Sequence, residues 1–344
     1  MAIRIGGLSL AMACFLGAAG AVAAEQSAGE AGRPALGTPG AMSSARAAAA
    51  RIDLGAIDPS KVFENAAFAT GGVGLRNRRI GGVEISGVSG GVKRAFAYWA
   101  VITDGPPGPA VRSVQLRRLF PGPPTPFETI SGVAIGTGDS PCWSGDRITV
   151  YRGAVPKSVA SGNGQYLVKL NNGANGNTDG RDPWASDGSL ALPLFEGLSL
   201  VIISRGNATV AVYDGDFAGA MFFDELVYRL KLPVGLAGAS QVLFHNIGAD
   251  GQKGNSLTVF AATAAEVTTL AGQAIAGPGS PANDSDWNGA IAGPLPQLWD
   301  DTGHDVTAEA LQSPTNKTLS LSVQAPDDCL VPVANVVSID KTAP

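Results

Sequence analysis

Charged side chains are scarce in this sequence, and histidine and cysteine are scarcer still. Of the 344 residues only 15% are charged, 2 are His and 3 are Cys. Two histidines are too few for a three-histidine zinc centre, and neither stands in an H-E-x-x-H pattern, so a zinc hydrolase is not expected. The formal net charge is −5. Unaided binding to nucleic acid or to an anionic membrane surface needs clustered Lys and Arg, so we expect neither partner.

Long helical periodicity is also missing, and residues 260–276 form the one serious helix candidate. Glycine and proline make up about a fifth of the chain, with 46 Gly and 23 Pro, which excludes a helical bundle or a coiled coil. Hydrophobic residues nevertheless make up 45% of the chain, enough to bury a sizeable core. The sequence is therefore expected to fold mainly as β-structure.

Runs of β-branched and aromatic residues between turn signals predict the strands. They lie at 94–102, 113–120, 147–152, 165–170, 198–204, 208–213, 226–232, 241–246, 256–261, 318–324 and 330–338. Alternation within several runs is typical of half-buried antiparallel strands. We therefore predict an all-β fold, an antiparallel, jelly-roll-like β-sandwich with long loops.

The N-terminus has the pattern of a secretory signal peptide. Arg4 precedes an apolar run at 5–22, and small residues allow cleavage after Ala23 or Ala24. Removal of this run would leave no segment inserted in a membrane; retention as an anchor and lipidation at Cys14 are the alternatives. The predicted organisation is a signal peptide at 1–24, a low-complexity leader or linker at 25–60 and a single sandwich domain at 61–344.

Cleavage would leave two cysteines, Cys142 and Cys329, in an oxidising compartment. An even number of cysteines in an exported chain predicts one disulfide between them. In the chain-entropy model, closing so long a loop stabilises the fold by up to about 5 kcal/mol. Two buried free thiols are the alternative.

Four segments, taken in order, resemble one kind of domain. They are RAFAYWAVI at 94–102, GDSPCWSGDRITVYRGAV at 138–155, LSLVIISRGNATVAVYDG at 198–215 and DDCLVPVANVV at 327–337. They are similar to uncharacterised jelly-roll-like β-sandwich domains of secreted bacterial surface and adhesin-like proteins. In those domains an AYLYW-like strand opens the sheet, a paired-strand block lies in the middle and a DCL-like strand closes it. The resemblance implies a cell-surface or extracellular role and transfers no catalytic residue.

One motif has the spacing of a calcium loop. Asp284, Asp286, Asn288 and Gly289 spell D-x-D-x-N-G, in which alternate side-chain oxygens converge on one ion and Gly permits a sharp turn. The alternative is a polar surface loop that holds acids without a metal. We predict a Ca²⁺ site here as one of the two interpretations.

The second half of that loop departs from the helix–loop–helix pattern. Position 12 is Leu295 instead of a bidentate Glu, so a remote carboxylate would have to complete the site. Asp300, Asp301 and Asp305 are the candidates. A second Asx-rich loop at 175–182 is more typical of a turn between strands than of a metal site.

Tryptophans lie beside these acids, outside the predicted strands. Loop tryptophans such as Trp184, Trp287 and Trp299 can stack on sugar rings, and with bound calcium they would suit a carbohydrate-binding surface. The alternative is that each indole pins its loop onto a sheet. We take these three residues as candidate ligand-binding residues.

Catalysis is the rival class of function. A polysaccharide hydrolase or lyase could use a carboxylate pair drawn from the acids at 214–216 and 224–225, although nothing in the spacing selects them. The formal G-x-S-x-G at 87–91 precedes a predicted strand instead of a helix, so we interpret it as a chance match. His245 ends an apolar strand and is expected to be a packed or capping residue.

Together these observations predict a secreted, non-catalytic cell-surface or extracellular protein with a binding or structural role. Calcium is the candidate stabilising ligand, and an extracellular glycan or a surface protein is the candidate partner. The alternatives are a calcium-assisted carbohydrate-binding module, a polysaccharide-active enzyme, and a subunit that self-associates by lending a strand from its N-terminal leader.

Overall fold

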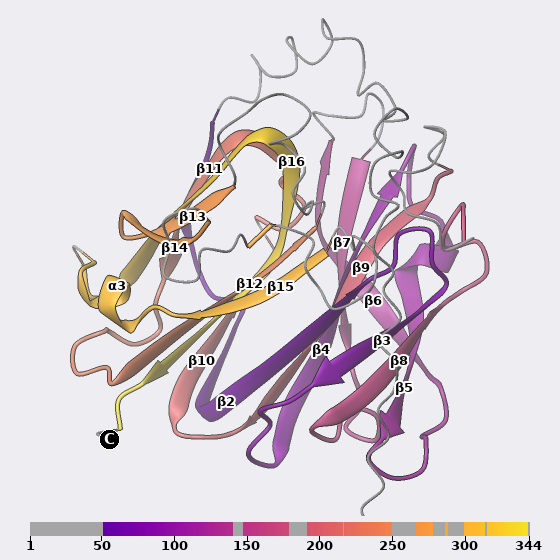
Figure 1. Cartoon of the computed structure of the whole chain (residues 1–344), viewed down its shortest axis with the longest axis horizontal. Helices are drawn as coiled ribbons and strands as arrows, with labels where there is room; N and C mark the ends of the chain where they lie inside the picture. The colour runs from indigo at the N-terminus through magenta and orange to yellow at the C-terminus, as the bar shows by residue number, and fades with distance from the viewer. Residues whose placement is uncertain are drawn as a thin grey trace, which may run out of the picture.

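The computed structural model describes residues 51–139, 147–178, 191–215, 217–249, 266–277, 286–287, 299–313 and 315–342. These residues are mostly in strands (Figure 1). The first nine strands are β1 (Ile52–Ile57), β2 (Lys61–Gly74), β3 (Ile80–Ile85), β4 (Val92–Thr103), β5 (Ser113–Phe120), β6 (Glu128–Asp139), β7 (Arg147–Ala154), β8 (Gly164–Leu170) and β9 (Leu194–Arg205). The others are β10 (Ala208–Tyr213), β11 (Phe222–Lys231), β12 (Gln241–Ala249), β13 (Val267–Leu270), β14 (Gln273–Ala276), β15 (Trp299–Asp305) and β16 (Thr318–Asp340).

Two short helices complete the described elements: the 3-10 helix η2 (Pro109–Arg112) and the α-helix α3 (Thr307–Leu311). Among the described residues, no helix is long and apolar enough to cross a membrane.

The strands join into one continuous hydrogen-bonded path. Its order is β1-β11-β16-β10-β2-β9-β4-β7-β6-β5-β8-β3, with β12 and β13 also paired to β16, β15 paired to β12, and β14 to β13. Of the described pairs, β1–β11 is parallel and the others are antiparallel. The predicted antiparallel sandwich is therefore confirmed.

Two long strands each take part in two sheets, and this divides the path into three layers. The first part of β16 pairs with β11 and β13, and its second part pairs with β10 and β12. Likewise, β6 pairs first with β5 and then with β7. We call β15-β12-β16-β10-β2-β9-β4-β7-β6 the central sheet, β5-β8-β3 with the start of β6 the β5 flank, and β1-β11-β13-β14 with the start of β16 the β11 flank. Figure 1 shows the two flanks at opposite sides of the molecule.

Three apolar clusters cover the two faces of the central sheet. One lies between the β5 flank and strands β2, β4 and β9, and a second lies between the β11 flank and strands β10, β12 and β16. The third covers the opposite face of the central sheet, which we call the inner face. This face is buried because the sheet curls, so that β15 contacts β2 and β9. Burying apolar area on both faces is the main stabilising contribution to such a fold.

The side chains of β4 and β9 follow from this double burial. Trp99 and Leu200 pack in the first cluster, whereas Tyr98 and Val201, their neighbours in sequence, pack on the inner face. The prediction that runs such as 198–204 would be half-buried is wrong for β9, because both of its faces are covered. The same prediction of half-buried strands is confirmed for the start of β16, where Leu319, Leu321 and Val323 are buried and the alternate residues are not.

Most predicted strands of the described residues are confirmed, with several changes of boundary. Runs 318–324 and 330–338 belong to one strand, β16, which bends from one sheet to another. The predicted leader ran to residue 60, but Ile52–Ile57 forms β1 at the edge of the β11 flank. In the helix candidate at 260–276, the described part forms the β13–β14 hairpin. The run at 256–261, the signal peptide and residues 25–50 lie outside the described residues.

Candidate functional site

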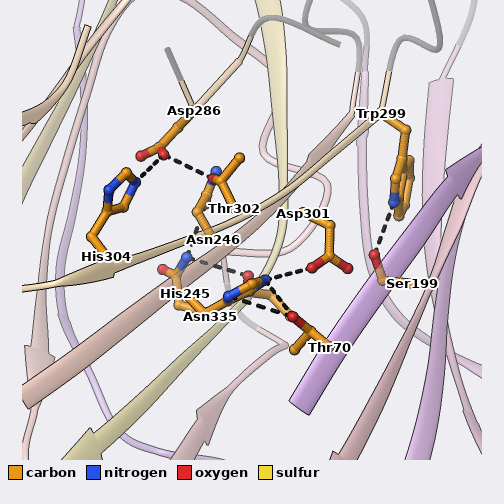
Figure 2. A network of polar contacts seen from close by, with 11 residues as sticks. Thr70, Ser199, His245, Asn246, Asp286, Trp299, Asp301, Thr302, His304 and Asn335 are labelled. Atoms are coloured by element: carbon orange, nitrogen blue, oxygen red, sulfur yellow. Dashed lines mark hydrogen bonds and ion pairs between the residues drawn. The ribbon is translucent and has the colours of Figure 1, made fainter. Parts of the chain in front are cut away.

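The chain's two histidines lie on the paired strands β12 and β15, near the acids that the sequence singles out. Because successive strand residues point to opposite faces, Asp301 faces the inner face of the central sheet, whereas Thr302 and His304 face the β11 flank. Figure 2 shows the polar contacts on both sides of these strands. Two separate Asp–His networks result.

On the inner face, His245 links three strands. Its Nε2 lies 2.8 Å from Thr70 Oγ1 on β2 and 2.5 Å from Asp301 Oδ1 on β15 (Figure 2). The Phe68 ring meets the imidazole edge-on, with 5.9 Å between the ring centroids. The histidine therefore joins the curled-over end of the sheet to β2.

This arrangement differs from a nucleophile–histidine–acid relay. In a relay, the acid binds one ring nitrogen and the hydroxyl binds the other. Here Thr70 Oγ1 lies 2.8 Å from Nε2, the nitrogen that also contacts Asp301, and 3.5 Å from Nδ1. Nδ1 also packs against Gly303, where an added Cβ would lie 2.6 Å from it. The network therefore ties β12 to β2 and to β15 through one imidazole ring.

A second contact closes the inner face nearby. Trp299 Nε1 donates to Ser199 Oγ over 2.9 Å, from β15 to β9 (Figure 2). The indole packs so closely on β9 that a Cβ at Gly197 would lie 2.4 Å from its ring. Glycine is required at this position because any side chain would displace the tryptophan.

On the side of these strands that faces the β11 flank, the Asp286 carboxylate is the shared partner of two β15 side chains. Its Oδ1 accepts from Thr302 Oγ1 at 2.8 Å and lies 2.5 Å from His304 Nε2 (Figure 2). The Asp286 side chain is 0% exposed, and its Oδ2 has no hydrogen-bond partner in the described structure. A buried carboxylate oxygen without a partner is costly unless a cation, a proton or water compensates it.

A second chain of hydrogen bonds crosses the layer between the β11 flank and the central sheet. Tyr228 on β11 donates its hydroxyl to Asn335 Oδ1 at 2.9 Å, and Asn335 Nδ2 donates to Asn246 Oδ1 at 3.0 Å. Burial, and after it the charge of Asp286, raise the pKa of Tyr228, although the Asn335 contact opposes the shift. The tyrosine is therefore neutral in the folded chain and serves as a donor between sheets.

The candidate calcium residues are divided between these networks. Asp286 lies on the β11-flank side and Asp301 on the inner face, whereas Asp284 and Asn288 lie outside the described residues. Asp300 is buried next to Asp301 on the same strand. Because neighbouring strand residues point apart, Asp300 and Asp301 cannot both join Asp286 around one ion. Among the described residues, no group of three or more His, Cys, Asp or Glu side chains could hold a metal.

The candidate sugar-stacking tryptophans are internal where they are described. Trp287 is 1% exposed and Trp299 is 0% exposed, so neither indole offers a face to a sugar. Trp287 packs edge-on against Phe222 on β11, with 6.1 Å between the ring centroids. For these two residues the alternative interpretation, pinning of the chain onto a sheet, agrees with the structure. Trp184 lies outside the described residues.

Other predicted residues are placed individually. Cys329 is buried on β16, but Cys142 lies outside the described residues, so the disulfide stays a prediction. The loop at 87–91 runs directly into β4, as expected for a chance G-x-S-x-G match. Asn175, in the second Asx-rich loop, binds backbone: it donates to Leu75 O and Arg78 O and accepts from Phe195 N–H.

The acids considered for glycoside hydrolysis have different partners. Asp214 accepts from the Tyr98 hydroxyl at 2.6 Å and from the Arg152 guanidinium at 2.7 Å. Burial and then the negative charge of Asp214 raise the pKa of Tyr98. Glu225 instead accepts from Ser322 and lies 3.4 Å from Arg51. These contacts tie each carboxylate into its own part of the sheet.

Sequence reasoning missed both Asp–His networks. It treated His245 as a packed or capping residue, which agrees with its burial, but it assigned no partner. The available signal was the alternation in 299–305, where Asp301 and the pair Thr302 and His304 fall on opposite faces of one strand. That alternation identifies the two networks only when β12 is known to pair with β15 and β2 is known to contact β15.

The fold and its networks define an antiparallel β-sandwich with a curled central sheet and buried polar contacts between its layers. No known protein-family model matches the chain, and no curated protein matches it in sequence.

Proposed function

We propose that this chain is an exported, non-catalytic β-sandwich with a structural or binding role at the cell surface or in the extracellular space. The observation that supports it best is the Thr70–His245–Asp301 network, where one imidazole contacts partners on two other strands and its Nε2 is the nearer ring nitrogen to Thr70. Such a contact stabilises the curl of the sheet. The chain thus uses one of its two histidines for assembly of the fold instead of for proton transfer.

Export and disulfide formation can be tested in one experiment. The chain with its own N-terminus is expressed in a bacterial host, the cells are fractionated, and the intact mass is measured after alkylation with and without reductant. We expect a product that lacks residues 1–24 outside the cytoplasm, with Cys142 and Cys329 alkylated only after reduction. A full-length cytoplasmic product would contradict the proposal.

The non-catalytic part is tested on the same purified chain. It is incubated with neutral and acidic polysaccharides, and new chain ends are measured together with those from Thr70→Val and Asp301→Asn. We expect no cleavage by the native chain, and both variants should be less stable because each loses a partly buried hydrogen bond worth about 1 kcal/mol. Cleavage that disappears in either variant would favour the hydrolase or lyase interpretation.

Calcium stabilisation is a second part of the proposal, supported by the unpartnered Oδ2 of Asp286. A hard cation prefers carboxylate oxygens, and a ligand that binds only the native state raises its stability. Thermal unfolding is compared in calcium and in chelator for the native chain, for Asp284→Ala with Asp286→Ala, and for the exposed control Asp104→Asn. We expect calcium to raise the Tm of the native chain and control only. An equal Tm in calcium and chelator for the native chain would remove calcium from the proposal.

Strand donation is a second candidate function, favoured by β1. This strand is the parallel member of an otherwise antiparallel set, lies at the edge of the β11 flank and falls within the predicted leader at 25–60. The same pairing could be made with β11 of another copy. Light scattering over a range of concentrations tests it: assembly should disappear when residues 25–57 are deleted, and a concentration-independent monomer would exclude it.

A further inference from the structure

The outer face of the β5 flank carries an unusual combination of side chains. On β5 and β8, Val114, Leu116 and Val168 point toward the central sheet and are buried. The alternate residues, Arg117 and Lys169, point away from it. This outward face lies at the periphery of the molecule (Figure 1).

Both cations converge on one aromatic ring. The Arg117 guanidinium carbon lies 4.5 Å from the centroid of the Phe127 ring, and Lys169 Nζ lies 5.7 Å from it. A cation over an aromatic face is attracted by the ring quadrupole, which orders the long side chains. Two positive charges are thereby held close together on the outer face of the sheet.

No carboxylate compensates these charges in the register of the sheet. Arg117 is opposite Leu167, and Lys169 is opposite Gln115 on one side and Ile80 on the other. Within the described residues neither cation forms an ion pair, and Arg117 Nε is buried without a hydrogen-bond partner. In a chain of net charge −5, this face is a local site of unpaired positive charge.

We propose that this face binds a linear polysaccharide that carries carboxylate or sulfate groups, an inference that rests on the proposed extracellular binding role. Arg117 and Lys169 contact the anionic groups, and Gln115 with its cross-strand neighbour Thr129 offers hydrogen bonds to sugar hydroxyls. The backbone groups of a sheet face are already paired, so recognition there uses side chains. An extended peptide would instead add along a sheet edge.

The test measures binding of alginate, dextran sulfate and neutral dextran to the purified mature chain at low and at high salt. The variant Arg117→Gln with Lys169→Gln removes the two charges, and Arg94→Gln with Lys157→Gln, two exposed cations elsewhere, removes the same charge as a matched control. We expect the native chain and the control to bind one or both anionic polymers, more weakly as salt increases. The Arg117/Lys169 variant should bind about tenfold more weakly or worse.

A second variant separates charge from geometry. Phe127→Ala keeps both cations but removes the ring that orders them, and we expect weaker binding with an unchanged net charge. Far-UV circular dichroism and Tm establish that each variant is folded. Equal losses in the control and in the Arg117/Lys169 variant would show general electrostatics and overturn the site.

Two further outcomes overturn the inference in different ways. Binding of polyglutamate as tightly as the acidic polysaccharides would assign the face to acidic peptides. Failure of the native chain to bind any anionic polymer would remove the site but would leave the exported product seen by mass and fractionation intact. The failure of this inference and the failure of the proposed function are therefore distinguishable.

Discussion

The two flanks are packed onto the central sheet by different kinds of contact. Under the β5 flank, Trp99 stacks on Tyr151 with 5.6 Å between centroids, and Gly132 provides the space, since a Cβ there would lie 2.5 Å from the indole. Under the β11 flank, a stacked aromatic pair, Phe217 and Tyr228, is accompanied by the hydrogen-bonded residues described above. Shape complementarity specifies the first packing, and directional polar contacts add to the second. The two should therefore respond differently to truncation and to pH.

The largest effect is expected under the β5 flank. Trp99→Ala removes a fully buried indole together with its hydrogen bond to Val111 O, and should lower the free energy of unfolding by about 3–5 kcal/mol. Urea unfolding monitored by circular dichroism measures it. Val133→Ala, at a position 68% exposed, is the control and should change the value by less than about 0.5 kcal/mol. A loss from Trp99→Ala as small as the control's would show that this layer is not close-packed.

Under the β11 flank, the contact between Asp286 and His304 should be energetically coupled. Asp286→Asn and His304→Gln should each lower the free energy of unfolding by about 1–3 kcal/mol, because each leaves a buried polar partner poorly satisfied. Since the residues touch, the double variant should lose less than the sum of the single variants. A double-mutant cycle by urea unfolding measures this, and strictly additive losses would contradict the pairing.

Tyr228 should make the β11 flank sensitive to alkali. Its pKa is raised, chiefly by burial, so its contribution to stability is complete below about pH 10, the value for unfolded tyrosine, and is lost as the pH rises above it. Tyr228→Phe should cost about 1 kcal/mol at pH 7, because Asn335 loses a donor, but should reduce the loss between pH 9 and pH 11. Urea midpoints at the two pH values measure both effects. An unaltered pH dependence in the variant would assign the alkaline loss to other groups.

The matching tyrosine-to-phenylalanine change under the β5 flank should have the smallest effect. It should leave the free energy of unfolding unchanged or raise it, whereas Tyr228→Phe lowers it. The Tyr151 hydroxyl is buried and has no hydrogen-bond partner in the described structure. Tyr151→Phe removes this unsatisfied group and keeps the stack on Trp99, so at pH 7 the free energy of unfolding should stay constant or rise by up to about 1 kcal/mol. The same urea assay measures it. Destabilisation as large as that of Tyr228→Phe would remove the distinction between the flanks.

The strands that were predictable are those rich in β-branched and aromatic residues. The predicted bounds of β5 and β10 agree with the structure, because both runs combine strand propensity with clear turn signals. Strands β2 and β6 were missed because glycine and alanine interrupt their apolar pattern. Tertiary packing requires glycine at these positions. An added Cβ would lie 2.2 Å from a backbone oxygen of a neighbouring segment at Gly71, and 1.8 Å from one at Gly136.

The candidate site was predictable only as a list of residue types. Asp286 was identified from calcium-loop spacing, and Asp300 and Asp301 as candidates for a remote carboxylate. The described structure instead pairs Asp286 with His304 and Asp301 with His245. Thr70 and His245 are far apart in the sequence and come into contact because the central sheet curls. No local pattern encodes that curl, because it depends on how β12 and β15 pack over β2.

The sequence alone determined the class of this protein: scarce charge, abundant glycine and alternating β-branched runs specify an antiparallel sandwich, since strand period and turn chemistry are local properties. The tertiary structure alone decided which face each residue occupies. Trp287 and Trp299 became core residues and Asp286 and Asp301 went to opposite sides of one strand pair, whereas Arg117 and Lys169 came together on Phe127. Burial and pairing are settled by long-range packing, in which segments far apart in the sequence exclude water from one another.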